Sequence, residues 1–132
     1  IKTYDEKFHM KNFGQKLQDN WALFREQMME IEGVEMKIIK RYISFKLGYN
    51  KSICYCNTQS NGFRIDIVRG YIKNGKKTDN FFELDDPKNM AVENSWTYKN
   101  GDTGHKYEIR FDKDTDVNYL VFLMHQRIQS YT

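Results

Sequence analysis

Proline and cysteine are nearly missing from this sequence of 132 residues, which has one proline and two cysteines. The single proline, Pro87, argues against a long disordered linker. Cys54 and Cys56 would share a strand face without the usual disulfide geometry, and free thiols fit a reducing cytosol. The sequence also lacks the run of about 20 apolar residues that a membrane-spanning helix needs. We therefore expect a cytoplasmic protein with no membrane partner.

Charge of one sign is not in large excess, because 21 basic residues stand against 18 acidic ones and the net charge is +3. Nucleic-acid-binding domains are usually more basic, or collect their basic residues on one face, so the total alone excludes nothing. Aromatic residues are plentiful at 15%. Because aromatic side chains bury large areas, this content favours a folded globular domain. The length allows one domain with a modest core.

Motifs for catalysis, metal binding or cofactor binding are also missing. The eight glycines stand singly, and neither G-x-G-x-x-G nor a P-loop pattern occurs. One C-x-C pair with the scattered His9, His105 and His125 lacks the paired spacing of structural zinc. Glu35-Met36-Lys37 matches the E-x-K half of a restriction-nuclease motif, but no upstream strand supplies the required aspartate. We expect no catalytic residues, no metal and no cofactor in this chain.

Hydrophobic periodicity predicts two long helices and several strands. In residues 15–32 the apolar positions alternate steps of four and three, which draws one stripe along a helix. A similar stripe predicts a last helix from residue 114 or 115 onward. Alternating patterns predict strands at residues 36–47, 52–59, 63–72 and 105–111. Asp86-Pro87 is typical of a helix start and predicts a short helix to about residue 93.

These elements predict an α+β domain with two long helices packed on one face of a mostly antiparallel sheet of about four strands. The predicted order is helix, three strands, short helix, strand, helix. We expect residues 15–132 to form this single domain and residues 1–14 to form an N-terminal extension.

Basic residues cluster on one face of the predicted sheet. The residues that we expect to bind nucleic acid are Lys40, Tyr42, Lys46, Arg64, Lys106 and Arg110. On a shared sheet, these five cations and one tyrosine would oppose only Asp66 and Glu108, and such a surface can hold phosphates and stack bases. The alternative is a solvated face in which cross-strand pairs, such as Arg64 with Glu108, satisfy one another.

Residues 93–102, ENSWTYKNGD, have neither helix nor strand period and predict a loop. The residues expected to anchor this loop are Asp86, Pro87, Trp96, Tyr98, Gly101 and Asp102. We expect Trp96 to fold back onto the edge of the core, because a large ring left in water forgoes roughly 1.5–3 kcal/mol of burial. The alternative is an exposed ring that stacks on a base or a partner, with Tyr98 beside it.

Several short segments follow one another in a characteristic order. They are Tyr4–His9, Tyr42–Lys46 (YISFK), Gln59, Leu84–Lys88 (LDDPK), Ser95-Trp96 with Gly101-Asp102, and Asp116–Ile128. Together they cover nearly the whole chain and resemble a bacterial and archaeal family of domains of unknown function, often labelled predicted transport proteins. The sequence departs from that family at Asn94-Ser95, where the family has glycine-histidine, and at Thr103 to His105, which are extra residues.

Domains of that family commonly form the C-terminal part of longer proteins. Some of those proteins begin with a restriction-endonuclease-like nuclease domain, and others carry the paired domains of GmrSD-type restriction enzymes. The resemblance therefore implies an accessory domain without catalytic activity, and a nuclease on an associated domain or subunit. Together with the basic sheet face, it predicts a module that binds nucleic acid, DNA rather than RNA. Two other classes stay open: a protein-interaction or oligomerisation domain, and a small-molecule pocket around Trp96.

Overall fold

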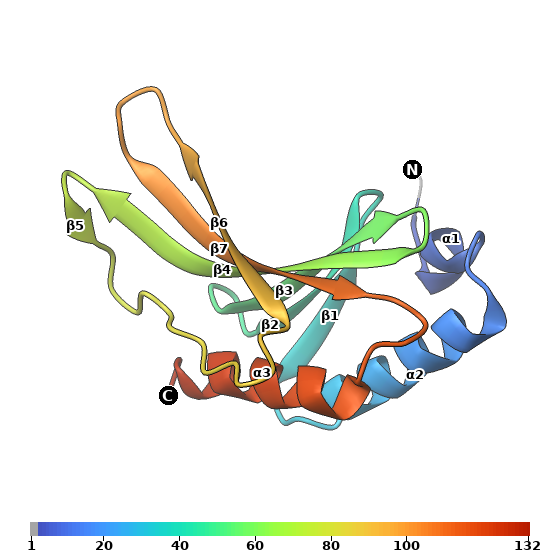
Figure 1. Cartoon of the computed structure of the whole chain (residues 1–132). Helices are drawn as coiled ribbons and strands as arrows, with labels where there is room; N and C mark the ends of the chain where they lie inside the picture. Colours follow the sequence, from blue (N-terminus) through green and yellow to red (C-terminus); the bar gives the residue numbers. More distant parts are fainter. Residues whose placement is uncertain (1–2) are drawn as a thin grey trace.

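A computed structural model describes residues 3–132, which form three helices and one sheet of seven strands (Figure 1). The helices are α1 (Glu6–Met10), α2 (Gln15–Met29) and α3 (Val117–Gln129). The strands are β1 (Val34–Ile38), β2 (Tyr42–Leu47), β3 (Ser52–Gln59), β4 (Gly62–Lys73), β5 (Lys76–Lys77), β6 (Ala91–Thr97) and β7 (Thr103–Phe111). All pairings are antiparallel, in the order β1-β2-β3-β4-β7-β6, and β5 pairs with the end of β4.

The predicted fold class is wrong, although the coarse α+β description holds. The sheet has seven strands where about four were expected, and α1 is only five residues long. The predicted pair of long helices on one face of a small sheet does not fit, because the sheet extends well beyond α2 and α3 (Figure 1). The predicted strand at residues 36–47 is two strands, β1 and β2, since the chain turns back at residues 39–41.

The core lies between α2, α3 and one face of the sheet. Alternation along the strands directs apolar side chains to this face, where the stripe of α2 meets them. The Trp21 ring lies 4.7 Å from the Phe63 ring, and the Phe24 ring lies 5.6 Å from the Phe45 ring, measured between centroids. The second stripe adds the fully buried residues Leu120, Leu123 and Met124 of α3. This packing orients the sheet, so its polar residues face the other way.

Within the predicted N-terminal extension at residues 1–14, the buried side chains of His9, Met10 and Phe13 pack against the rest of the domain, and residues 1 and 2 lie outside the described part. The buried His9 of α1 ties this segment to the sheet. Its Nε2 lies 2.7 Å from the carbonyl oxygen of Ile39, and its Nδ1 contacts the hydroxyl of Thr58. The extension was expected because residues 1–14 are mostly polar, but these long-range contacts hold its short helix in place.

The predicted short helix after Asp86-Pro87 is a turn. The Asn89 N–H donates to the Asp86 carbonyl oxygen at 2.9 Å, and Asn89 has a φ of 53°, which stops a helix. The Asp86 carboxylate accepts hydrogen bonds from the Ala91 N–H at 2.8 Å and from the Tyr119 hydroxyl of α3. The aspartate therefore caps a turn that docks on α3 and leads the chain into β6.

Four strands extend past the helices as a twisted arm, which we define as residues 69–78 and 95–105 (Figure 1). The expected loop at residues 93–102 is wrong for residues 93–97, which belong to β6, and residues 98–102 form the turn that joins β6 to β7. Arg69, at a β-bulge, fixes the base of the arm. Its guanidinium lies 3.0 Å from Glu83 and 4.6 Å from the centre of the Tyr107 ring.

Candidate nucleic-acid interface

The sheet face that points away from α2 and α3 is named the open face, because no helix among residues 3–132 lies over its centre (Figure 1). The residues that the strand registers place on it include Glu35, Lys37, Tyr42, Lys46, Tyr55, Asn57, Arg64, Asp66, Tyr71, Asn94, Trp96, Lys106, Glu108 and Arg110. Tyr55 stands opposite Asp66, and Asp66 stands opposite Glu108, so the face is continuous across β3, β4 and β7.

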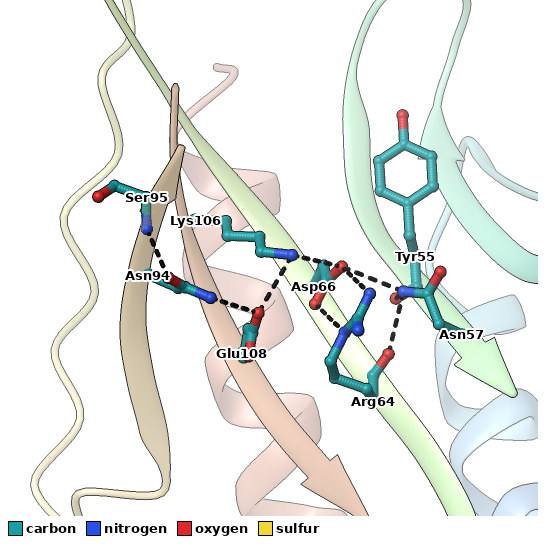
Figure 2. Close-up of polar contacts among 8 residues, drawn as sticks. All are labelled: Tyr55, Asn57, Arg64, Asp66, Asn94, Ser95, Lys106 and Glu108. Atoms are coloured by element: carbon teal, nitrogen blue, oxygen red, sulfur yellow. Dashed lines mark hydrogen bonds and ion pairs between the residues drawn. The ribbon is translucent and has the colours of Figure 1, made fainter. Parts of the chain in front are cut away.

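Asp66 occupies the centre of the open face and is only 8% exposed. Figure 2 shows three side chains that donate to its carboxylate. The donors are Asn57 Nδ2 at 3.1 Å, Arg64 Nε at 3.1 Å and Nη2 at 3.2 Å, and Lys106 Nζ at 3.2 Å. Because a buried carboxylate is costly without partners, these bonds make Asp66 a fixed part of the surface.

Glu108 extends the same network toward β6 (Figure 2). It accepts a hydrogen bond from Asn94 Nδ2 at 2.9 Å and lies 3.1 Å from Lys106 Nζ. The Asn94 hydrogen bond and, after it, Lys106 lower the pKa of Glu108, although burial opposes them. The hydrogen bonds that Arg64 donates to Asp66 raise the pKa of Arg64. Two cations thus face two carboxylates, and the centre of the open face has no net charge.

The six residues predicted to bind nucleic acid differ in whether their side chains are paired with a carboxylate. Arg64 and Lys106 are held in the central network, and Arg64 pairs along its own strand with Asp66 where a cross-strand pair with Glu108 was considered. Arg110 is exposed at the end of β7 and lies 3.3 Å from a carboxylate oxygen of the neighbouring Asp112.

The other three predicted residues lie at the β1–β2 side of the open face. Lys46 and Tyr42 point outward from β2, whereas Lys40 lies in the turn before it, next to Arg41. Sequence reasoning did not include Lys37, which β1 places on the same face opposite Ser44. Of residues 3–132, no carboxylate comes within 4.0 Å of these four cations, although Glu35 stands opposite Lys46.

Two tyrosines lie between these cations and the central network. The Tyr42 and Tyr55 rings meet edge to face with centroids 5.0 Å apart, and both rings are partly exposed. Tyr55 stands directly beside Asn57 and Asp66 (Figure 2). Sequence reasoning missed Tyr55 as a site residue, although its alternation with Cys54 and Cys56 already indicated the polar face.

Trp96 lies on the open face of the arm, away from the core edge where it was expected. Its indole packs across Gly104 of β7 so closely that a Cβ on this glycine would come within 2.1 Å of the ring. The Tyr71 and Tyr98 rings flank it edge-on, with centroids 6.1 Å and 6.4 Å from that of Trp96. The site therefore has a second aromatic group, which the sequence placed in a loop.

The remaining predicted anchor residues have structural roles. Asp86 and Pro87 form the turn before β6. Gly101, with a φ of 91°, completes the β6–β7 turn. The Asp102 carboxylate accepts the Asn74 N–H at 3.2 Å and so joins the tips of the two hairpins of the arm.

The histidines, cysteines and acidic residues of the described chain do not gather into a metal site. Residues 3–132 contain no group of three or more His, Cys, Asp or Glu side chains placed to hold a metal ion. Cys54 and Cys56 are free and buried, and burial raises the pKa of the Cys56 thiol well above its usual value. None of the helices described is long and apolar enough to cross a membrane.

Comparisons with protein-family models, with curated proteins and with solved structures found no match for this chain. The family resemblance and the function that it implies thus stay predictions.

Proposed function

We propose that this domain binds nucleic acid on its open face, as a non-catalytic accessory module of a cytoplasmic restriction or defence nuclease. One observation carries the binding: the free cations Lys37 and Lys46 lie beside the partly exposed tyrosine pair of Tyr42 and Tyr55 on an uncovered sheet face. The partnership with a nuclease, and DNA as the substrate, are supported only by the sequence resemblance.

The two groups of side chains match the two parts of a nucleic acid. Lysines without a carboxylate partner are available to phosphates, and binding them releases counterions from the backbone. Tyrosine rings on a sheet surface stack on bases of any sequence. The neutral network around Asp66 carries no net charge to attract phosphates, so we place the backbone contacts at the β1–β2 side and at the arm.

The test is a charge reversal, Lys37→Glu with Lys46→Glu, measured by fluorescence anisotropy with labelled DNA and RNA at two salt concentrations. We expect affinity to fall about tenfold or more, and the slope of log K against log salt to drop by about two. The control is Lys16→Glu with Lys88→Glu, which changes the net charge equally on the helix side of the domain, where both lysines form exposed ion pairs. Equal loss in both double variants would contradict a binding site on the open face.

A second candidate function is protein interaction through β6. This strand forms one edge of the sheet, and its Val92 is 65% exposed. Exposed edge strands offer unpaired backbone groups to another chain. Unchanged nucleic-acid affinity in the open-face variant, with a native melting curve and a concentration-dependent sedimentation coefficient, would favour this candidate.

A further inference from the structure

We infer that the nucleic acid bound is single-stranded and that the arm stacks one of its bases on Trp96. This inference deepens the proposed function and rests on it. It concerns the part of the open face formed by residues 69–78 and 95–105, which extends past the helices (Figure 1).

The Trp96 ring is held in position before any ligand arrives. One side of the indole lies on the backbone of Gly104, and Tyr71 and Tyr98 limit its sideways movement. The ring is partly exposed, and Tyr98 beside it is 46% exposed. A ring with a fixed orientation loses little conformational entropy when a base stacks on it, and this favours binding.

Three lysines lie at the ends of the two hairpins that form the arm. Lys73 and Lys76 stand opposite each other at the tip of the β4–β5 hairpin, and Lys99 lies in the β6–β7 turn. Among residues 3–132 none of the three forms an ion pair, and Lys73 Nζ lies 5.4 Å from the centre of the Tyr71 ring. The nearby Asp102 carboxylate already accepts bonds from Asn74 and Asn100. The arm therefore offers stacking and phosphate contacts within one short segment.

This combination favours a single strand over a duplex. A duplex keeps the flat faces of its bases inside the stack, so it could use the lysines but not the rings. A single strand could place bases on Tyr42 and Tyr55 at one side of the open face and on Trp96 at the other. The neutral network of Asp66 and Glu108 lies between these two groups.

A purely structural role for Trp96 makes a different prediction. In that case the indole only covers Gly104 and stabilises the arm, so its loss would lower stability without affecting any ligand. Trp96→Phe is the conservative variant, because phenylalanine can still cover Gly104 and can still stack on a base. A folded Trp96→Phe protein that binds as the wild type does would show that an aromatic ring is sufficient at this position. Melting curves of all variants show whether the arm variants remain folded.

The experiment measures anisotropy of a labelled oligothymidine strand of about twelve nucleotides, and of its duplex with oligoadenosine, at about 50 mM salt. We expect the wild type to prefer the single strand and Trp96→Ala to weaken single-strand binding by roughly 5- to 150-fold. Duplex binding should change by less than about twofold, and Trp96→Phe should retain most of the affinity.

Three results would count against the inference, and they separate it from the proposed function. Unchanged single-strand affinity in Trp96→Ala, together with a loss in Lys37→Glu/Lys46→Glu, overturns the arm contact alone. Stronger binding of the duplex than of the single strand overturns the inference that the ligand is single-stranded. If the folded wild type binds neither probe nor single-stranded RNA, both the inference and the proposed function fall. Quenching of Trp96 fluorescence in a Trp21→Phe background gives an independent reading, because Trp96 is then the only tryptophan.

Discussion

At the scale of single residues, Asp66 determines how the open face behaves. Its carboxylate forms ion pairs with Arg64 and Lys106, two cations that the sequence analysis predicted to bind phosphates. Sequence alone cannot show this pairing. Arg64 lies two positions before Asp66 on the same strand, so its approach follows from alternation, but Lys106 reaches Asp66 only through the β4–β7 register.

Replacing Asp66 with alanine should destabilise the domain by about 2–4 kcal/mol, because it leaves Arg64, Lys106 and Asn57 without their shared acceptor. Urea unfolding at neutral pH measures the change. Asp85→Ala is the control, since this carboxylate forms no ion pair with residues 3–132. A loss below about 1 kcal/mol for Asp66→Ala would mean that the network contributes little.

The lowered pKa of Glu108 predicts a pH effect on stability. A carboxylate with a folded pKa below its unfolded value, about 4.3 for glutamate, stabilises the fold above that value and loses this contribution as the pH falls through the folded pKa. We therefore expect the free energies of unfolding of wild type and Glu108→Gln to differ most near neutral pH and to converge as the pH falls through the folded pKa of Glu108. A constant difference across the acid range would show that the bonds to Glu108 do not depend on its charge.

At the scale of elements, the two long helices could be predicted from the sequence, whereas the edge strand β6 could not. α2 and α3 each bury one stripe, so their periodicity is visible. β6 is an edge strand whose residues are mostly exposed, and residues 92–95 therefore show no alternation. Its strand conformation comes from pairing with β7, a contact that lies outside any local window. Asp86-Pro87 was misread because an aspartate caps turns as well as helices.

The packing of Trp96 on Gly104 predicts a strong coupling within the arm. Gly104→Ala should cost about 1–3 kcal/mol, because the new methyl group displaces the indole. In a Trp96→Ala background the same substitution should cost little, and urea unfolding of the four proteins gives the coupling energy. Additive effects would mean that the ring can move aside freely.

At the scale of the whole molecule, a net charge of +3 conceals an uneven distribution. Free lysines lie at the β1–β2 side and at the arm, and the centre between them is neutral. The total charge could not reveal this pattern, because it depends on which cations are paired in the fold.

A substitution in the neutral centre should change nucleic-acid affinity in the direction opposite to the lysine variants. Glu108→Gln removes one negative charge from the open face, so nucleic-acid affinity at neutral pH should rise by about twofold, the size of one Coulomb contact through water. Anisotropy at low salt measures it, with Glu26→Gln on the exposed side of α2 as the control. A fall in affinity would show that the Glu108 carboxylate contacts the ligand.

An NMR titration shows most directly whether the open face is the binding surface. Backbone amide signals of the ¹⁵N-labelled domain are followed while an oligothymidine strand is added. We predict shifts concentrated at Lys37, Lys46, Tyr55, Trp96 and their strand neighbours, with the exposed positions of α2 and α3 unchanged. Shifts concentrated on α2 and α3, or no shifts at saturating strand and low salt, would contradict binding on the open face.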